Sequence, residues 1–427
     1  MTAAPPDRAE RLLTVGIPVF NGKSLLRNCL HSVVSSTLSR DRFEVVVADD
    51  GSWEPETREI LREFEESLAA DPGFFRVISL GTNSGGAARP RNRILDEAVG
   101  AYVFFVDADD TIGSLALERV ADALASTPAD WVALHQVPVN GRSPGCEVLR
   151  PRAEVPRVRA LTTLTVHKVF RRAEIERQHL RFDEGLPSGQ DVAFAFSFLL
   201  RAERFLMLGG YDYYYLTQHA ENPNEPEHLS RRARTPEALI EKNERILRSM
   251  MTDLRTSTLP EAEQRTILVR IVLPRLLLQE GYLRAVADVG PEAGPPALRR
   301  LSALLAGPLL ADVDPAGHKG LTREHLTTVA DADWAGLGRL VRPTPRPASR
   351  GGSSPRWRRR ARRLVDLASG RARHRRVLVE LDRLRRSVED LHAGQRRLEA
   401  DLQAGLQRRD DSAGGGPSGP VGTPSAP

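Results

Sequence analysis

The sequence predicts an α/β fold in which a parallel sheet is covered by helices on both faces. Over the first hundred residues, uninterrupted apolar runs alternate with segments of helical spacing, and this pattern is typical of parallel strands buried on both sides. Two of the apolar runs end on paired acids. The chain has 427 residues of which 41% are hydrophobic, so it can bury a substantial core and is not disordered as a whole.

The elements follow one another in a regular order. Strands are predicted where β-branched and aromatic residues run together, and helices where apolar residues recur every three or four positions. The predicted strands are 12–20, 43–50, 75–80 and 101–110, and the predicted helices between them are 25–37, 54–70 and 86–99. An edge strand or a transition from the sheet to a lid is expected at 211–216, followed by a polar loop over 218–230 that could cover a site.

Acids at the ends of two strands form the first candidate site. Ligands of such sheets lie beyond the carboxyl ends of the strands, where Asp49-Asp50 and Asp107-Asp109 are expected. An acid there can accept hydrogen bonds from a base or a ribose. Strand alternation places Asp107 and Asp109 on the same side of the chain, where a divalent cation could neutralise a diphosphate. The alternative is that these acids only cap turns.

Two other nucleotide sites are excluded by spacing. A P-loop needs four residues between its glycines, whereas Gly16 and Gly22 enclose five, among them Pro18. The glycine-rich turn of a dinucleotide-binding fold is also absent after the first strand.

Composition divides the chain beyond the first sheet. Helical spacing dominates from about 235, with prolines around 291–308 expected to interrupt it, and a Pro/Gly/Ser-rich stretch follows. The predicted segments are a flexible start (1–10), an α/β domain (11–235), a helical region (236–345), a linker (346–358), a basic segment with a coiled coil (359–409) and a disordered tail (410–427).

The basic segment precedes apolar heptads. Between Arg356 and Arg376 there are ten arginines and one acid, a net +9, so the rest of the chain carries 5 − 9 = −4. The cluster could bind anionic lipid, capture a polyanionic acceptor, or be a solvated start to the coiled coil. Leu and Val at alternating four- and three-residue steps over 377–402 predict self-association, and Gln395 in a core position would set register.

The cysteine content and the hydropathy of the chain indicate where in the cell the protein is expected. Cys29 and Cys146 cannot form a disulfide framework, which favours a reducing cytoplasm. No signal peptide and no membrane span are expected, so we predict a cytoplasmic protein, with peripheral contact to the inner face of the membrane as an option. Nucleic acid is not an expected partner.

Five segments together resemble a known family. They are IPVFN (17–21), DDGS (49–52), NSGGAARPRN (83–92), YVFFVDADD (102–110) and GQDVAF (189–194). These resemble the inverting GT-A glycosyltransferases of family 2, in particular the wall teichoic acid transferases that add N-acetylglucosamine to poly(ribitol phosphate). The resemblance covers about 11–230. It implies a GT-A fold with a mixed, mainly parallel sheet.

The resemblance implies a role for each matching residue. Pro18 and Phe20 would line a uracil pocket, and Asp50 would bind the uracil or ribose. Asn83 and Arg91 would complete recognition of the nucleotide and diphosphate. Asp107 would contact the ribose or a metal-bound water, Asp109 would ligate Mn²⁺ or Mg²⁺, and His228 would reach the diphosphate and metal. Arg91 as a solvated arginine and His228 as an ordinary loop histidine remain alternatives.

Asp191 matches the catalytic base of the family, which takes the proton of the acceptor hydroxyl. Gln190 stands where the family usually has a second acid, and it cannot act as a base. The alternative for Asp191 is a helix N-cap. His135, His167 and His179 receive no role.

The resemblance therefore implies transfer of a sugar from a UDP-sugar to a surface polymer such as a polyol phosphate, with N-acetylglucosamine as the first candidate for the sugar. A hexosyltransferase acting on a capsular or lipid-linked saccharide is the runner-up. A coiled-coil scaffold with a degenerate transferase domain is the alternative of another class.

Overall fold

The structure is a computed structural model that describes residues 11–71, 73–139, 146, 148, 150–217, 235–279, 281–307 and 322–341. The chain divides into two compact units, Met1–Arg342 and Pro343–Pro427. The predicted linker, basic segment, coiled coil and tail all fall in the second unit, outside the described residues. Their predicted roles stay predictions.

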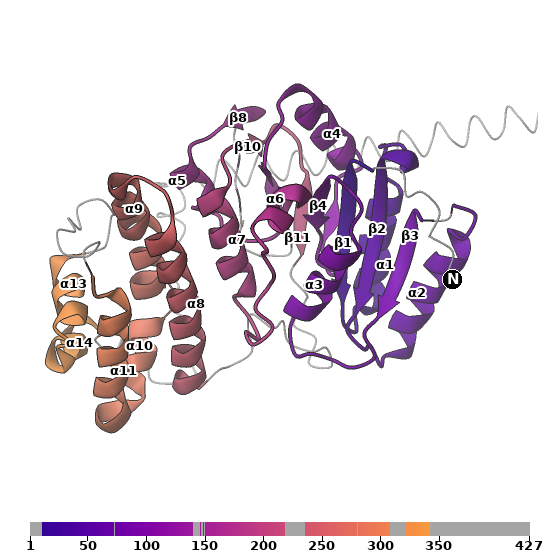
Figure 1. The fold of residues 1–427 in the computed structure, drawn as a ribbon. Helices are drawn as coiled ribbons and strands as arrows, with labels where there is room; N and C mark the ends of the chain where they lie inside the picture. The colour runs from indigo at the N-terminus through magenta and orange to yellow at the C-terminus, as the bar shows by residue number, and fades with distance from the viewer. Residues whose placement is uncertain are drawn as a thin grey trace, which may run out of the picture. The chain divides into compact units, whose positions relative to one another are not determined.

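The first unit begins with alternating strands and helices and ends with helices (Figure 1). Its strands are β1 Leu13–Val19, β2 Phe43–Asp49, β3 Phe75–Ser79, β4 Tyr102–Phe105, β5 Thr111–Ile112, β6 Trp131–Leu134, β7 Gln136–Val139, β8 Arg152–Glu154, β9 Lys168–Arg171, β10 Phe205–Leu208 and β11 Tyr214–Thr217. Its helices are α1 Lys23–Val34, η1 Arg40–Arg42, α2 Pro55–Ser67, α3 Ala88–Glu97, α4 Ala116–Ser126, α5 Arg157–Ala160, α6 Arg172–Arg177, α7 Gln190–Arg201, α8 Pro236–Thr256, α9 Glu261–Ile267, η2 Leu268–Val272, η3 Arg275–Gln279, α10 Tyr282–Asp288, α11 Gly290–Leu305, α13 Arg323–Ala330 and α14 Trp334–Leu340.

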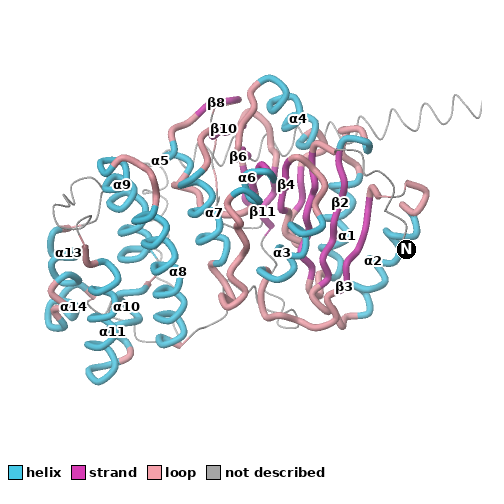
Figure 2. Tube along the Cα trace, viewed as in Figure 1, coloured by secondary structure: helices cyan, strands magenta, loops and turns pink. Residues whose placement is uncertain are grey.

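The main sheet has the order β3-β2-β1-β4-β9-β6-β10-β8 (Figure 2). The pairs β3–β2, β2–β1, β1–β4 and β6–β10 are parallel, whereas β9 runs antiparallel to both of its neighbours and β8 runs antiparallel to β10. The predicted mixed, mainly parallel sheet is confirmed. A second sheet has the order β5-β11-β7, so β11 is its middle strand and not the edge strand considered from the sequence.

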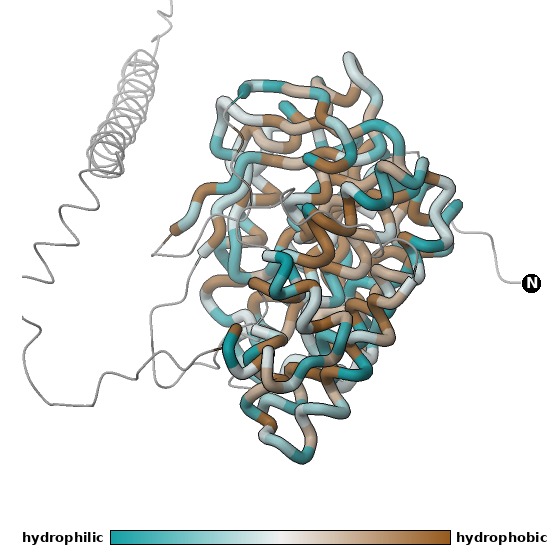
Figure 3. Tube along the Cα trace, turned by 90° about the vertical axis from the view of Figure 1, so that its left-hand side faces the viewer, coloured by the Kyte–Doolittle hydropathy of each residue, from teal (hydrophilic) through white to brown (hydrophobic). Residues whose placement is uncertain are grey.

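Side-chain alternation builds a separate core on each face of the main sheet. Val45 and Val47 of β2 pack in the core that includes residues of α1, α2 and α4. Val46 and Ala48 pack in the other core, with residues of α3, α7 and α8. Helices therefore cover both faces, as predicted. The change between hydrophilic and hydrophobic residues along the helices is visible in Figure 3.

The described residues between 235 and 341 are largely helical, as their spacing predicts. Thr235 caps α8 by accepting the N–H of Ala238 at 3.3 Å. The prolines near 291 were expected to interrupt the helices, but α11 runs through Pro295 and Pro296. Pro291 lies in the first turn, where no hydrogen bond is lost, whereas each of the two interior prolines removes a helix hydrogen bond. Leu298 and Leu301, which follow them in α11, are fully buried and anchor the helix.

The helical region packs on α7 through apolar and ionic contacts. Arg201 of α7 donates to the Asp253 carboxylate of α8 at 2.7 Å, and Ser197 donates to the same side chain. Figure 1 shows α7 between the sheet and α8. No helix in the described ranges combines the length and the hydropathy that a membrane-spanning helix requires.

Candidate functional site

The end of β1 presents one aromatic ring to solvent. Pro18 pairs with Ala48 of β2. It lies beyond the last residue of β1 that pairs with β4, so the N–H that proline lacks is not needed for the β1–β4 pairing. Pro18 is buried, whereas Phe20 is 41% exposed just past the strand. Asn21 fixes this corner because its side-chain oxygen accepts the N–H groups of Trp53 and Glu54, each at 3.1 Å.

The two acids after β2 have different partners. Asp49 accepts the N–H of Ser52 at 3.0 Å and so caps the turn, as in the alternative weighed from the sequence. Asp50 is 2% exposed and uses Oδ2 to accept both the N–H and the hydroxyl of Ser84 at 2.8 Å. Its Oδ1 is buried and has no hydrogen-bond partner among the described residues. Burial raises the pKa of Asp50, although the bonds from Ser84 lower it.

The loop before α3 connects this acid to the far side of the site. Asn83 is exposed and accepts the N–H of Gly85 at 2.7 Å. A Cβ at Gly86 would lie 3.2 Å from the Pro187 carbonyl oxygen, so the loop passes close to the segment that precedes α7. Asn92 of α3 strengthens this connection, since it accepts the N–H of Phe182 at 2.7 Å and donates to its carbonyl at 3.0 Å.

The third strand is shorter than the sequence predicted. β4 ends at Phe105, and the acids that follow form a turn in which the N–H of Asp110 donates to the Asp107 carbonyl at 3.0 Å. Strand alternation therefore does not apply to Asp107 and Asp109, and that part of the prediction was wrong. The turn instead brings Asp107 beside Asp110. Asp109, which lies between these two residues in the sequence, is half-buried.

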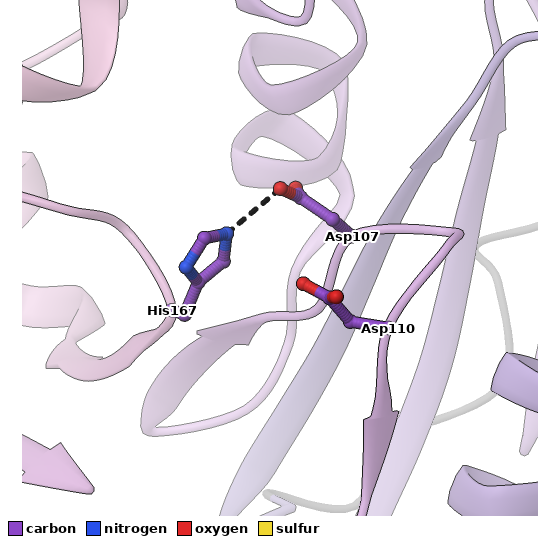
Figure 4. Close-up of side chains that lie close together, drawn as sticks. All are labelled: Asp107, Asp110 and His167. Atoms are coloured by element: carbon purple, nitrogen blue, oxygen red, sulfur yellow. Dashed lines mark hydrogen bonds and ion pairs between the residues drawn. The ribbon is translucent and has the colours of Figure 1, made fainter. Parts of the chain in front are cut away.

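Both oxygens of Asp107 are engaged. His167 Nε2 lies 2.7 Å from Oδ2 (Figure 4). Arg91 donates to Oδ1 at 2.8 Å. The Tyr214 hydroxyl donates to Asp110 Oδ2 at 2.8 Å and accepts the N–H of Asp107 at 3.1 Å. These contacts draw together α3, the turn after β4, the start of β9 and the middle strand of the second sheet.

The pKa values of Asp107 and Asp110 are shifted in opposite directions. Burial alone would raise the pKa of Asp107, but the charges of His167 and Arg91 hold it well below its ordinary value. Burial and then the charge of Asp109 raise the pKa of Asp110 to about 7, against an ordinary value of 3.8. The turn therefore brings several carboxylates together in a site that is partly buried from solvent.

Such a turn fits a divalent cation. Asp107, Asp110 and His167 each offer a ligand atom, and these atoms all lie within 4.8 Å of one another. Mn²⁺ and Mg²⁺ favour carboxylate ligands, and a cation would relieve the charge that raises the pKa of Asp110. The predicted ligand Asp109 is in the same turn, whereas His228 lies outside the described residues.

Asp191 lies in the first turn of α7. The N-cap is Gly189, whose φ of 82° suits glycine, so Asp191 is not the cap that the alternative required. The Asp191 carboxylate accepts only the N–H of Val192 in the described part of the chain, at 2.9 Å. Gln190 is 5% exposed, and its Oε1 is buried without a partner among described residues.

The strand after His167 begins with a buried lysine. Lys168 follows His167 in β9, is fully buried, and donates to the carbonyl and hydroxyl oxygens of Thr165. Burial lowers the pKa of Lys168 to about 8, and the charge of Asp191 acts in the opposite direction.

Sequence reasoning missed three members of the site: Asp110, His167 and Tyr214. Asp110 was within a recognised motif and was overlooked because a strand was assumed to continue there. His167 and Tyr214 are 60 and 107 residues from Asp107 and reach it only through pairing of β9 with β4 and of β11 with β5. A single histidine before a strand has no spacing signal that would have identified it.

The sequence is similar to known glycosyltransferases. Residues 14–179 match the family described as "Glycosyl transferase family 2". The poly(ribitol-phosphate) beta-N-acetylglucosaminyltransferase TarS of Staphylococcus aureus is 29% identical over 262 residues, which are 61% of this chain and 43% of TarS. The poly(ribitol-phosphate) beta-glucosyltransferase of Bacillus spizizenii is 28% identical over 221 residues, 51% of this chain and 33% of the relative.

Solved structures give the same assignment. The crystal structure of S. aureus TarS matches with a TM-score of 0.65 and 25% identity, over 77% of this chain and 55% of that one. TarS 1–349 in complex with UDP-GlcNAc matches with a TM-score of 0.64 and 25% identity, over 77% of this chain and 90% of that one. The chain spans less than half the length of both curated relatives. Residues 14–179 of this chain are therefore a glycosyl transferase family 2 domain.

Proposed function

We propose that this protein is an inverting glycosyltransferase that moves a sugar from a UDP-sugar to a hydroxyl of a polyol-phosphate polymer. N-acetylglucosamine is the first candidate for that sugar. One observation carries the proposal: Asp50 keeps a buried carboxylate oxygen without a partner in the described structure, at the strand edge where the Phe20 ring is exposed. An acceptor oxygen and an aromatic face are what a uracil with its ribose requires. TarS, whose structure with UDP-GlcNAc is similar, supports the choice of donor.

In this proposal the nucleotide lies along the carboxyl edge of the sheet. Phe20 and Pro18 contact the uracil, Asp50 accepts a hydrogen bond from the uracil or ribose, and Asn83 faces the nucleotide from the loop before α3. Arg91 is buried and contacts Asp107, so it acts on the nucleotide through that carboxylate. Asp107 accepts a ribose hydroxyl or a metal-bound water, because each carboxylate oxygen has a second lone pair.

Asp191 supplies the base. An acceptor hydroxyl is a weak nucleophile, so Asp191 takes its proton as the new C–O bond forms on the face opposite the departing diphosphate. Attack in line on an α-linked donor then gives a β-linked product. Asp109, with His228, would hold Mn²⁺ or Mg²⁺, which supplies positive charge to the leaving diphosphate.

The acceptor follows from the named substrates of the relatives. TarS and TarP of S. aureus are named as poly(ribitol-phosphate) transferases, with 29% and 26% identity to this chain. A hexose remains the second candidate sugar because the B. spizizenii relative is named a glucosyltransferase. Self-association through the heptads over 377–402, and membrane or acceptor binding by the arginine cluster, are part of the same proposal.

A donor panel tests the proposal. UDP-GlcNAc, UDP-glucose and UDP-galactose are each incubated with poly(ribitol phosphate), Mn²⁺ and the full chain, and product is detected by mass spectrometry. We expect a mass increase of one N-acetylhexosamine per transfer. Asp191→Asn should reduce the rate by about 100- to 10,000-fold, whereas Asp288→Asn, on the surface of α10, should leave it unchanged. Indifference to metal and to Asp191→Asn would favour the scaffold instead.

A further inference from the structure

His167 is a buried histidine that the proposed chemistry does not use. It is 6% exposed, and Figure 4 shows its ring reaching from a separate segment toward Asp107 and Asp110. Its Nε2 lies 2.7 Å from Asp107 Oδ2. An ionised carboxylate only accepts hydrogen bonds, so the proton of this contact is on Nε2.

The ring is fixed on its other side by an aromatic contact. His167 stacks on Tyr214 with ring centroids 4.9 Å apart and an interplanar angle of 27°. The hydroxyl of Tyr214 is itself bound to Asp110 and to the backbone of Asp107. Rotation of the His167 ring would therefore break the stack and the hydrogen bond together.

Asp107 is thus held from two sides. Arg91 donates to one oxygen and His167 to the other, and the Arg91 guanidinium rests 5.6 Å from the centre of the Phe182 ring. A carboxylate with both oxygens engaged keeps one orientation, which is the condition for recognising a ribose hydroxyl repeatedly in the same place. Each Asp107 oxygen still has a second lone pair that faces away from these donors and can accept a hydrogen bond from a ligand.

We infer that His167 is a positioning residue for the nucleotide: with Arg91 it orients the Asp107 carboxylate toward the ribose. This inference rests on the proposed function, because it assigns the orientation of a carboxylate in the same donor site. It adds a residue from outside the recognised motifs.

Three variants separate the hydrogen bond from the packing. His167→Phe keeps an aromatic ring against Tyr214 and removes the N–H donor. His167→Gln loses the ring but places an amide N–H near the Nε2 position. His31→Phe, on α1 beside Phe64, is the matched control. UDP affinity is measured by calorimetry with Mn²⁺ on the full chain, and the melting temperature of each variant is recorded.

The expected result is a dissociation constant for UDP raised about 10-fold in His167→Phe, a value within about threefold of wild type in His167→Gln, and no change in His31→Phe. In an Asp107→Asn background, His167→Phe should cause no further loss, because residues that act through one group are not additive.

Two results would overturn the inference while the protein still binds UDP. One is unchanged UDP affinity in His167→Phe. The other is an equal loss of affinity and of melting temperature in both His167 variants, which indicates a role in stability alone. Absence of UDP binding by the wild type would overturn the proposed function and this inference with it.

Discussion

The acidic ends of β2 and β4 have similar sequences and different surroundings. After β2, Asp49 closes a turn while Asp50 is held by Ser84 and keeps one oxygen without a partner in the described structure. After β4, the oxygens of Asp107 and Asp110 all accept hydrogen bonds, and their charges accumulate. The first end is therefore suited to accept a hydrogen bond from a ligand, and the second to attract a cation. The same residue type serves two purposes because its neighbours differ.

Among the acids at the two strand ends, the one assigned to the cation should give the largest effect. Asp109→Asn removes a charge beside the leaving diphosphate, so we expect the rate of UDP release at saturating Mn²⁺ to fall about 100- to 1,000-fold. Asp122→Asn, an exposed acid on α4, is the control. Full activity in Asp109→Asn would remove the distinction between the two strand ends.

Asp50→Asn should weaken donor binding at the other end. Asparagine can still accept from Ser84, but its amide cannot serve as a second charged acceptor. Loss of one charge-assisted bond, about 1.5–3 kcal/mol, raises KM for the UDP-sugar about 10- to 100-fold with a smaller change in kcat. An unchanged KM would contradict nucleotide binding at Asp50.

The raised pKa of Asp110 gives a prediction about stability and pH. The unfolded chain loses this proton near pH 3.8 and the folded chain near 7, so the stabilisation is present below about 4 and is lost as the pH rises to 7. In EDTA, wild type should therefore lose about 1–3 kcal/mol more unfolding free energy than Asp110→Asn between pH 5 and pH 8. Denaturant titrations at both pH values measure this. Parallel curves would show that charge does not accumulate at the turn.

Asp49→Asn should have the smallest effect. Its amide oxygen can still accept the N–H of Ser52, so the unfolding free energy should change by less than about 1 kcal/mol and KM should stay constant. Comparison with Asp50→Asn tests adjacent residues of one motif. A large rise in KM for Asp49→Asn would show that Asp49, and not Asp50, contacts the nucleotide.

The sequence predicted the first four strands of the main sheet because they are apolar runs separated by segments of helical spacing, but it assigned no range to β6, β8, β9 or β10. β1 and β2 differ from their predicted ranges by one or two residues. The site was only partly predictable. The strand-end pattern pointed to Asp50, and the family resemblance pointed to Asp191. The turn at Asp107 depends on where β4 stops pairing, and the place of His167 depends on antiparallel pairing of β9. Local periodicity carries neither piece of information.

The position of the cation tests the central claim most directly. Crystals of the protein grown with UDP and Mn²⁺ would give an anomalous scattering peak for manganese. The account predicts a peak about 2.1 Å from an Asp109 oxygen, in contact with the diphosphate, with the Asp107–His167 hydrogen bond intact and Asp191 facing the diphosphate across the site. A peak ligated by Asp107, Asp110 and His167, with that bond broken, would contradict it.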